Sequence, residues 1–262
     1  MPTDWMPAFP HRKEFLGVDF DMLTLNGLLD RLARVAPDSA YSYIVTPNVD
    51  HIVRLTAIGN DGRDADVRAA YDRASLCVCD SRVLARLARS CGIDLPVVPG
   101  SDLTARLFDD VIAPGDRIAV VGGGEGVLGD VRRLYPSVDI RHHLPPMGLR
   151  HDDAALGRAV DFVVESRPRF TFLAVGSPQQ EILAHRIASQ PEAPGCALCV
   201  GAAIEFVSAH RKRAPRLLQR LGLEWSYRLA QDPARMWRRY LWDGPRIFPI
   251  VIRWKRARSQ RG

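Results

Sequence analysis

The sequence predicts an α/β protein built on a doubly wound, mostly parallel sheet. Short apolar runs that suit buried strands alternate with longer stretches whose apolar residues recur at helical spacing. The strand runs are apolar on both faces, which is typical of strands covered by helices on both sides of a sheet. Polar residues and glycines follow most of these runs, where such sheets bind ligands.

The elements of the first half follow this alternation. Gly92 ends one helix, and Ser101 and Asp102 are typical of the start of the next. The predicted strands are residues 14–20, 41–47 and 75–80, and the predicted helices are residues 21–36, 81–92 and 101–112.

The second half repeats the pattern with more regular spacing. Pro178 stands near the first turn of its helix, a position that proline tolerates. The predicted strands are residues 116–123, 138–143, 169–176 and 195–203, and the predicted helices are residues 126–136, 152–168 and 177–190.

Basic residues are concentrated at the end of the chain. Residues 1–210 hold 21 basic and 27 acidic side chains, whereas residues 211–262 hold 15 and 3. We therefore expect an α/β catalytic domain over residues 1–210 and a basic, helical appendage over residues 211–262 that meets an anionic partner. The chain shows neither the apolar region of a signal peptide nor the ~20 apolar residues that span a bilayer.

The five cysteines predict buried thiols of a reducing compartment. They are Cys77, Cys79, Cys91, Cys196 and Cys199. Their number is odd, and their spacing lacks the paired motifs of a zinc site. We expect no metal.

A glycine cluster follows the strand at residues 116–123. Gly124, Gly126 and Gly129 have the G-x-G-x-x-G spacing of a dinucleotide-binding turn. However, the turn comes late in the chain, and Asp139 lies within the next strand instead of ending it. An NAD- or FAD-dependent oxidoreductase, a tight turn with only a packing role, and a site for another nucleotide all remain open, and the last is favoured.

Five strand ends are expected to converge on one ligand site, because parallel strands place their carboxyl ends at the same edge. The candidate residues there are Thr46 and Asn48, Asp80, Gly122, Gly123 and Gly124, Gly176 and Gln180, and Gly201.

A set of ordered motifs carries a family resemblance. The chain contains FLAVGSPQQE, CVGAAIEF, RKRAP and GLEWSYRLAQDPARMWRRYL, and upstream TPNVDH, CDS and GSDL. In this order, over residues 15–245, they resemble the WecG/TagA/CpsF glycosyltransferases. The resemblance implies a Rossmann-like fold.

The resemblance also implies an activity. Such enzymes transfer a hexose from a UDP-sugar to a polyprenyl-diphosphate-linked sugar, inverting the anomeric centre without an obligatory metal or cofactor. This chemistry serves bacterial cell-surface polysaccharide or exopolysaccharide synthesis. Val97, Val98 and Pro99 replace an arginine frequent in the family, which leaves N-acetylmannosamine and glucose both open as the sugar.

By the same resemblance, Asp80 matches the family's catalytic aspartate and would act as the base that deprotonates the acceptor. The alternative is that Asp80 caps the following helix, a role for which Ser81 competes. Thr46 and Asn48 match active-site residues, with turn formation as their alternative. Gln180 and the glycines would seat UDP. Glu181 suits the first turn of its helix whatever the function, and His51, His142 and His143 are expected to be satisfied or solvated.

The basic tail predicts contact with a membrane surface. Trp237, Trp242 and Trp254 are interleaved with arginines, a composition typical of the membrane–water interface. A partner protein, including a second copy of the chain, and a nucleic acid are the alternatives, and we expect no nucleic acid. The resulting expectation is a peripheral protein on the cytoplasmic face of the inner membrane; a non-enzymatic adaptor is the rival class.

Three tail arginines have an implied role of their own. Arg228, Arg235 and Arg238 match the family's arginines and are expected to clamp a diphosphate, because guanidinium pairs with phosphate in bidentate fashion. The alternative is a basic helix face without a particular role. The appendage is expected to order on the membrane or on a partner protomer.

Overall fold

A computed structural model describes residues 11–57, 64–207, 218, 224–231 and 233–260. Its centre is a six-stranded parallel sheet in the order β4-β3-β8-β7-β5-β6. The strands are β3 (Ser42–Val45), β4 (Leu76–Cys77), β5 (Arg117–Gly122), β6 (Asp139–His143), β7 (Phe170–Ala174) and β8 (Cys196–Cys199). The predicted parallel, Rossmann-like sheet is confirmed.

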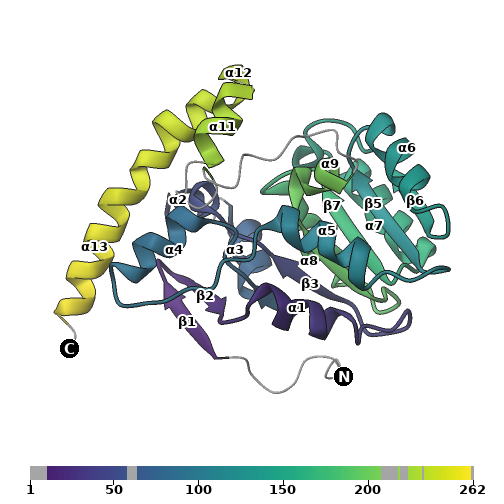
Figure 1. The fold of residues 1–262 in the computed structure, drawn as a ribbon, viewed down its shortest axis with the longest axis horizontal. Helices are drawn as coiled ribbons and strands as arrows, with labels where there is room; N and C mark the ends of the chain where they lie inside the picture. The colour runs from purple at the N-terminus through teal and green to yellow at the C-terminus, as the bar shows by residue number, and fades with distance from the viewer. Residues whose placement is uncertain (1–10, 58–63, 208–217, 219–223, 232, 261–262) are drawn as a thin grey trace.

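Helices cover both faces of this sheet (Figure 1). Successive side chains of a strand point to opposite faces of the sheet. Ile44 packs in one buried cluster, whereas its neighbours Tyr43 and Val45 pack in the other. The first cluster contains side chains of α1 (Leu25–Leu32), α5 (Gly100–Asp110) and α6 (Glu125–Leu134). The second contains side chains of α2 (Val49–Ala57), α3 (Ala65–Asp72), α4 (Arg82–Arg89), α7 (Asp153–Ser166) and α8 (Gln179–Ile187).

The first predicted strand is wrong. Residues 14–20 belong to an antiparallel hairpin of β1 (Arg12–Phe15) and β2 (Val18–Asp21), which forms a sheet of its own. Leu16 and Gly17 turn the chain with φ of 57° and 76°, and two positive φ values in a two-residue loop are typical of a tight hairpin. The hairpin is fastened to β4, because Asp21 Oδ2 accepts a hydrogen bond from the Cys77 amide at 2.7 Å.

The end of the chain is helical, as predicted. It contains α11 (Glu224–Gln231), α12 (Pro233–Trp237), a π-helical turn (Arg238–Asp243), a short 3₁₀ turn (Gly244–Arg246) and α13 (Ile247–Ser259). These helices run along one side of the α/β body (Figure 1). The expected boundary between residues 210 and 211 lies outside the described residues.

The last helix is packed onto the body. Ile247 and Val251 are buried. The Trp254 ring meets Phe15 edge-on, with 5.2 Å between ring centroids, and its Nε1 donates to Glu14 Oε1 at 3.1 Å. α13 is thereby attached to β1. In the described part of the chain, no helix combines the length and apolarity needed to cross a membrane.

Candidate functional site

Thr46 lies at the centre of the sheet edge where the predicted residues meet. It follows β3, its side chain is buried, and its Oγ1 donates to the Cys199 carbonyl at the end of β8, with 2.8 Å between the oxygens. A Cβ built on Gly100 would lie 3.8 Å from Thr46 Oγ1. The start of α5 therefore also reaches this point.

Asp80 follows β4 and faces the first residue of α5. Its Oδ1 accepts a hydrogen bond from the Gly100 amide at 2.8 Å, and its own amide donates to the Pro47 carbonyl at 3.0 Å. The helix-cap alternative belongs to Ser81, whose Oγ accepts from the Leu84 amide at 3.2 Å at the start of α4. The Asp80 carboxylate thus lies at the sheet edge, where the N-terminus of α5 favours its negative charge.

Asn48 serves the local turn with its oxygen. Oδ1 accepts from the Asp50 amide at 3.1 Å, where α2 begins. This contact is the turn role that the sequence allowed as an alternative, and the predicted contact with a ligand stays a prediction.

The glycines after β5 have different surroundings. Gly122 has φ of +90°, and a Cβ there would lie 2.8 Å from the Ala174 backbone, so close packing of β5 against β7 requires glycine. Gly123 also has positive φ, +74°. A Cβ on Gly124 would meet no atom within 4 Å. Only this last glycine of the three opens onto free space.

The strand beside this turn does not end in an acidic residue. Asp139 begins β6, and the strand ends at His143. Hydrogen bonds from Arg141 and Arg117 hold the pKa of Asp139 below its usual range. The ribose-binding acid that a dinucleotide site places at this strand end is therefore replaced by histidine.

His51 and His142 have hydrogen-bond partners, as expected, whereas His143 departs from the expectation. His142 Nε2 lies 3.0 Å from the Gly122 carbonyl and its Nδ1 lies 3.2 Å from Glu125 Oε1. His143 stacks on Phe162, but its buried Nε2 has no hydrogen-bond partner among the described residues. His51 Nδ1 lies 3.0 Å from the Tyr71 hydroxyl.

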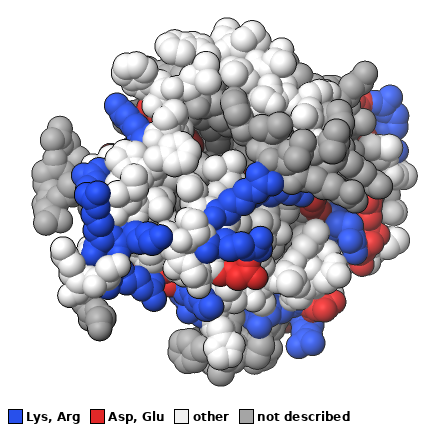
Figure 2. Space-filling view, turned by 60° about the vertical axis from the view of Figure 1, so that its left-hand side comes forward, with Lys and Arg blue, Asp and Glu red and all other residues white. Residues whose placement is uncertain are grey.

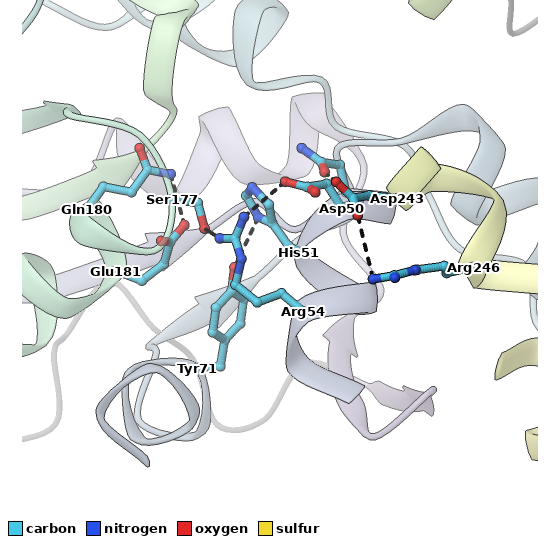
Figure 3. Close-up of polar contacts among 10 residues, drawn as sticks. Asp50, His51, Arg54, Tyr71, Ser177, Gln180, Glu181, Asp243 and Arg246 are labelled. Atoms are coloured by element: carbon cyan, nitrogen blue, oxygen red, sulfur yellow. Dashed lines mark hydrogen bonds and ion pairs between the residues drawn. The ribbon is translucent and has the colours of Figure 1, made fainter. Parts of the chain in front are cut away.

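Gln180 joins the ends of β7 and β8. Its side chain is buried, and Oε1 accepts from the Gly201 amide at 2.9 Å. Its Nε2 donates to Glu181 Oε1 at 2.8 Å (Figure 3). The backbone amide of Gln180 also donates to the Gly176 carbonyl at 3.0 Å. Three predicted residues, Gly176, Gln180 and Gly201, are thus in one hydrogen-bonded unit.

Glu181 joins this hydrogen-bonded group, whereas the sequence predicted for it only a role in the first turn of its helix. It stands in the first turn of α8, as expected, yet it is completely buried. Burial raises the pKa of Glu181, while the hydrogen bond from Gln180, the nearby Ser177 hydroxyl and the charge of Arg54 act in the opposite direction. The acidic residue in P-Q-Q-E gave no sign of its burial, because first-turn acids are usually solvated.

Arg54 extends this polar group to α2. It donates to Ser177 Oγ at 3.0 Å and pairs with Asp50 Oδ2 at 3.2 Å (Figure 3). On the other side of α2, Arg246 pairs with Asp243 at 3.6 Å in the C-terminal helices, which contact α2. α2 therefore lies between the sheet edge and the appendage.

The predicted tail arginines are placed only by their backbone. Arg228 lies in α11, Arg235 lies in α12, and Arg238 begins the π-helical turn; their side chains lie outside the described part of the structure. Trp237 and Trp242 are 52% and 62% exposed. Trp254 differs from the expectation of an interfacial residue, since it packs on Phe15.

The cysteines are free, as predicted. Four are buried, and Cys91 is half-buried. Burial raises the pKa of Cys79 and of Cys196 to about 12. In the described residues, no group of three or more His, Cys, Asp or Glu side chains is arranged to hold a metal.

The protein has a Rossmann-like parallel sheet, and its strand ends bring Asp80, Thr46, Gln180 and the glycine turns to the carboxyl edge. This edge is where such sheets bind ligands, which makes it the candidate site. The chain belongs to the glycosyl transferase WecG/TagA/CpsF family, whose model matches residues 13–261. The family resemblance is confirmed.

Two curated relatives that the chain resembles share one name, N-acetylglucosaminyldiphosphoundecaprenol N-acetyl-beta-D-mannosaminyltransferase. The protein of Bacillus spizizenii strain W23 is 30% identical over 168 residues, which cover 62% of this chain and 62% of that relative. The protein of Staphylococcus aureus strain MRSA252 is 23% identical over 236 residues, which cover 86% and 87%.

Proposed function

We propose that this protein is an inverting glycosyltransferase that moves a hexose from a UDP-sugar to a polyprenyl-diphosphate-linked sugar. The family and the name of its relatives support this proposal. The observation that carries it is the Asp80 carboxylate, held at the sheet edge by the Gly100 amide and released from helix capping by Ser81. An inverting transfer needs one such base beside the acceptor hydroxyl.

In the proposed reaction, Asp80 removes the proton from the acceptor hydroxyl as that oxygen attacks the anomeric carbon of the donor. The bond from this carbon to the diphosphate oxygen breaks on the opposite side, and UDP leaves with the electron pair. Backbone N–H groups of the glycine turns and the arginines at positions 228, 235 and 238 would stabilise the charge that develops on the diphosphate. The step requires no metal in this scheme.

N-acetylmannosamine is the favoured sugar. It is the sugar in the printed name of the relatives. The segment beside Asp80 is apolar, since Val97 pairs with Cys79 and the Val98 amide donates to the Cys79 carbonyl at 2.8 Å. Because this segment also lacks the arginine that is frequent in the family, glucose is the alternative to compare directly.

The surface of α13 supports docking on an anionic membrane. Phe248 and Ile252 are exposed there, one helical turn apart. Figure 2 shows Lys and Arg side chains gathered on the side of the molecule where α13 lies. Lys255 Nζ contacts the Ser90 carbonyl at 3.4 Å, which joins α13 to the end of α4. The exposed basic residues on these two helices are Arg86, Arg89, Arg253, Lys255, Arg256 and Arg258.

We further propose that this surface holds the protein at the cytoplasmic face of the inner membrane, where a lipid-linked acceptor would be presented. Each basic residue near an anionic surface contributes about 1 kcal/mol of attraction. Aromatic side chains such as Trp237 and Trp242 suit the headgroup level. The arginines of the appendage would then close over the diphosphates, on the membrane or on a second copy of the chain.

The test of the function uses the full chain with a short polyprenyl-diphosphate-linked N-acetylglucosamine. UDP-N-acetylmannosamine, UDP-glucose and NAD are compared as ligands by thermal shift and as reactants by product formation. We expect stabilisation by the UDP compounds, transfer from UDP-N-acetylmannosamine, and loss of transfer in Asp80→Asn. Stabilisation by NAD alone would instead indicate the oxidoreductase alternative, and no response to any ligand would indicate an adaptor.

A further inference from the structure

Glu181 is buried in a way that calls for a functional explanation. Its side chain is 0% exposed. Oε1 accepts from Gln180 Nε2 at 2.8 Å, whereas Oε2 has no hydrogen-bond partner among the described residues. Burial of an incompletely paired carboxylate is unfavourable for folding. Such groups concentrate at functional sites, where the unfavourable burial serves the chemistry.

The partner of Glu181 has only one orientation compatible with its neighbours. The two ends of the Gln180 amide are an acceptor and a donor that could exchange places. The Gly201 amide can only donate, and it binds Gln180 Oε1 at 2.9 Å. With Oε1 on this side, Nε2 faces Glu181 and donates to its Oε1 at 2.8 Å. The Glu181 carboxylate therefore fixes the side-chain amide of Gln180, which in turn binds the backbone of Gly201 after β8.

The backbone held in this way borders the catalytic candidate. Thr46 Oγ1 donates to the Cys199 carbonyl immediately before this turn. Val200 lies on the other side, where a Cβ on Gly100 would come within 3.7 Å of its Cγ1. Since Gly100 donates to Asp80, a shift of the turn after β8 would disturb both Thr46 and the proposed base.

Arg54 supplies the charge that accompanies Glu181. It binds Ser177 Oγ at 3.0 Å, and both residues oppose the rise in the pKa of Glu181 that burial causes. Because Arg54 is also paired with Asp50, the polar group stays connected from α2 to the turn after β8.

We infer that Glu181 is a positioning residue that acts through Gln180 to fix the turn after β8 for binding of the UDP-sugar. The nature of the ligand rests on the proposed function, whereas the positioning itself rests on the contacts of the ligand-free protein. An experiment can therefore contradict the proposed function without contradicting the positioning role of Glu181, and the reverse.

The test compares two substitutions of nearly equal size. Glu181→Gln retains an acceptor for Gln180 Nε2, and Glu181→Met removes it. We expect Glu181→Met to fold, to bind UDP at least tenfold more weakly and to have a lower kcat. The reason is that the side-chain amide of Gln180 loses the acceptor for its Nε2. We expect Glu181→Gln to stay within about threefold of the wild type. Glu165→Met, on the exposed surface of α7, is the control for the substitution itself.

A double substitution shows whether Glu181 acts through Gln180. If it does, Glu181→Met combined with Gln180→Leu should lose no more UDP affinity than Gln180→Leu alone. Gln180→Leu already removes the side chain through which Glu181 acts on Gly201. Full additivity of the two losses would overturn the inference. So would a Glu181→Met protein with unchanged UDP affinity and kcat, or equal losses in Glu181→Met and Glu181→Gln.

Hydrogen exchange provides a readout without any ligand. The Gly201 amide should be protected in the wild type and in Glu181→Gln, and should exchange at least tenfold faster in Glu181→Met at equal global stability. This result would stand even if the wild type failed to bind UDP, in which case the proposed function alone would fall. Unchanged protection of Gly201 in Glu181→Met would overturn the positioning role.

Discussion

The Oδ1 atom of Asp80 lies 2.8 Å from the amide nitrogen of Gly100, the first residue of α5. This hydrogen bond joins the end of a strand on one side of the sheet to the start of a helix 20 residues later. The side-chain oxygen of an asparagine at position 80 could accept the same hydrogen bond but could not act as a base. Asp80→Asn therefore tests the proposed base while keeping the contact with Gly100.

Asp80→Asn should therefore abolish transfer while leaving the site intact. We expect kcat to fall by about 10²–10⁴, the range that general bases contribute. UDP affinity should stay within about twofold. Product formation and isothermal titration measure the two effects. Ser81→Ala is the neighbouring control: it should lose about 1 kcal/mol of stability with the α4 cap and retain transfer.

The glycines at 122 and 124 should respond oppositely to a methyl group. Gly122→Ala places a Cβ against the Ala174 backbone in a left-handed conformation and should destabilise folding by at least ~2 kcal/mol. Gly124→Ala meets open space at φ of −85° and should leave the free energy of unfolding within ~0.5 kcal/mol. Urea unfolding compares them.

Gly124→Ala also tests where UDP binds. If UDP occupies the space beside Gly124, Gly124→Ala should weaken its binding several-fold at unchanged stability. Unaltered UDP affinity in this variant would place the nucleotide away from the turn after β5.

The buried Glu181 makes stability depend on pH in a defined direction. Its pKa is raised in the folded protein, so the folded state binds the proton more tightly than the unfolded state. Its contribution to stability is therefore greatest below the ordinary pKa of a glutamate and is lost as pH rises through the raised value.

Glu181→Gln removes this titration. The variant should be more stable than the wild type at neutral pH, and its advantage should shrink as the solution is acidified. Denaturant unfolding at several pH values provides the measurement. A constant difference across that range would show that Glu181 is not the group responsible.

Trp254 should hold α13 on the body. Trp254→Ala removes the edge-on contact with Phe15 and the hydrogen bond to Glu14, and should cost about 2 kcal/mol. Amides of α13 should then exchange faster. Trp242→Ala, at an exposed position, should leave this exchange unchanged and instead weaken binding to anionic vesicles.

Cys91 should be the fastest thiol to react with a disulfide reagent. Burial raises the pKa of Cys79 and Cys196 to about 12, so their thiolates are scarce at neutral pH, and Cys77 and Cys199 are buried too. Absorbance at neutral pH should show one rapid equivalent, and Cys91→Ser should remove it.

Sequence periodicity predicted the parallel sheet because its strands are apolar on both faces and are separated by helices. The same reasoning predicted the sheet-edge site, since strand ends of a parallel sheet converge whatever their order in the chain. It missed the hairpin at residues 12–21, because Leu16 in a left-handed turn is not a sequence signal for a turn. α2 and α3 were also missed.

The burial of Glu181 could not be predicted for another reason. First-turn acids favour helices through the helix dipole without being buried, and burial here depends on long-range packing of α8 against α3, α7 and β8. The choice between Asp80 and Ser81 as the α4 cap depended on one residue of register, which the sequence left open.

The strand order also has a consequence for synthesis on the ribosome. β3 and β4 emerge first and form one edge of the sheet, and β5 and β6 form the other, but only β8 and β7 join the two pairs. Because a chain is made from its N-terminus, the nascent protein carries two unjoined halves until residue 199 has left the exit tunnel. Asp80 and Gly124 belong to different halves, so a prematurely released chain would have both parts of the proposed active site without the strands that join them.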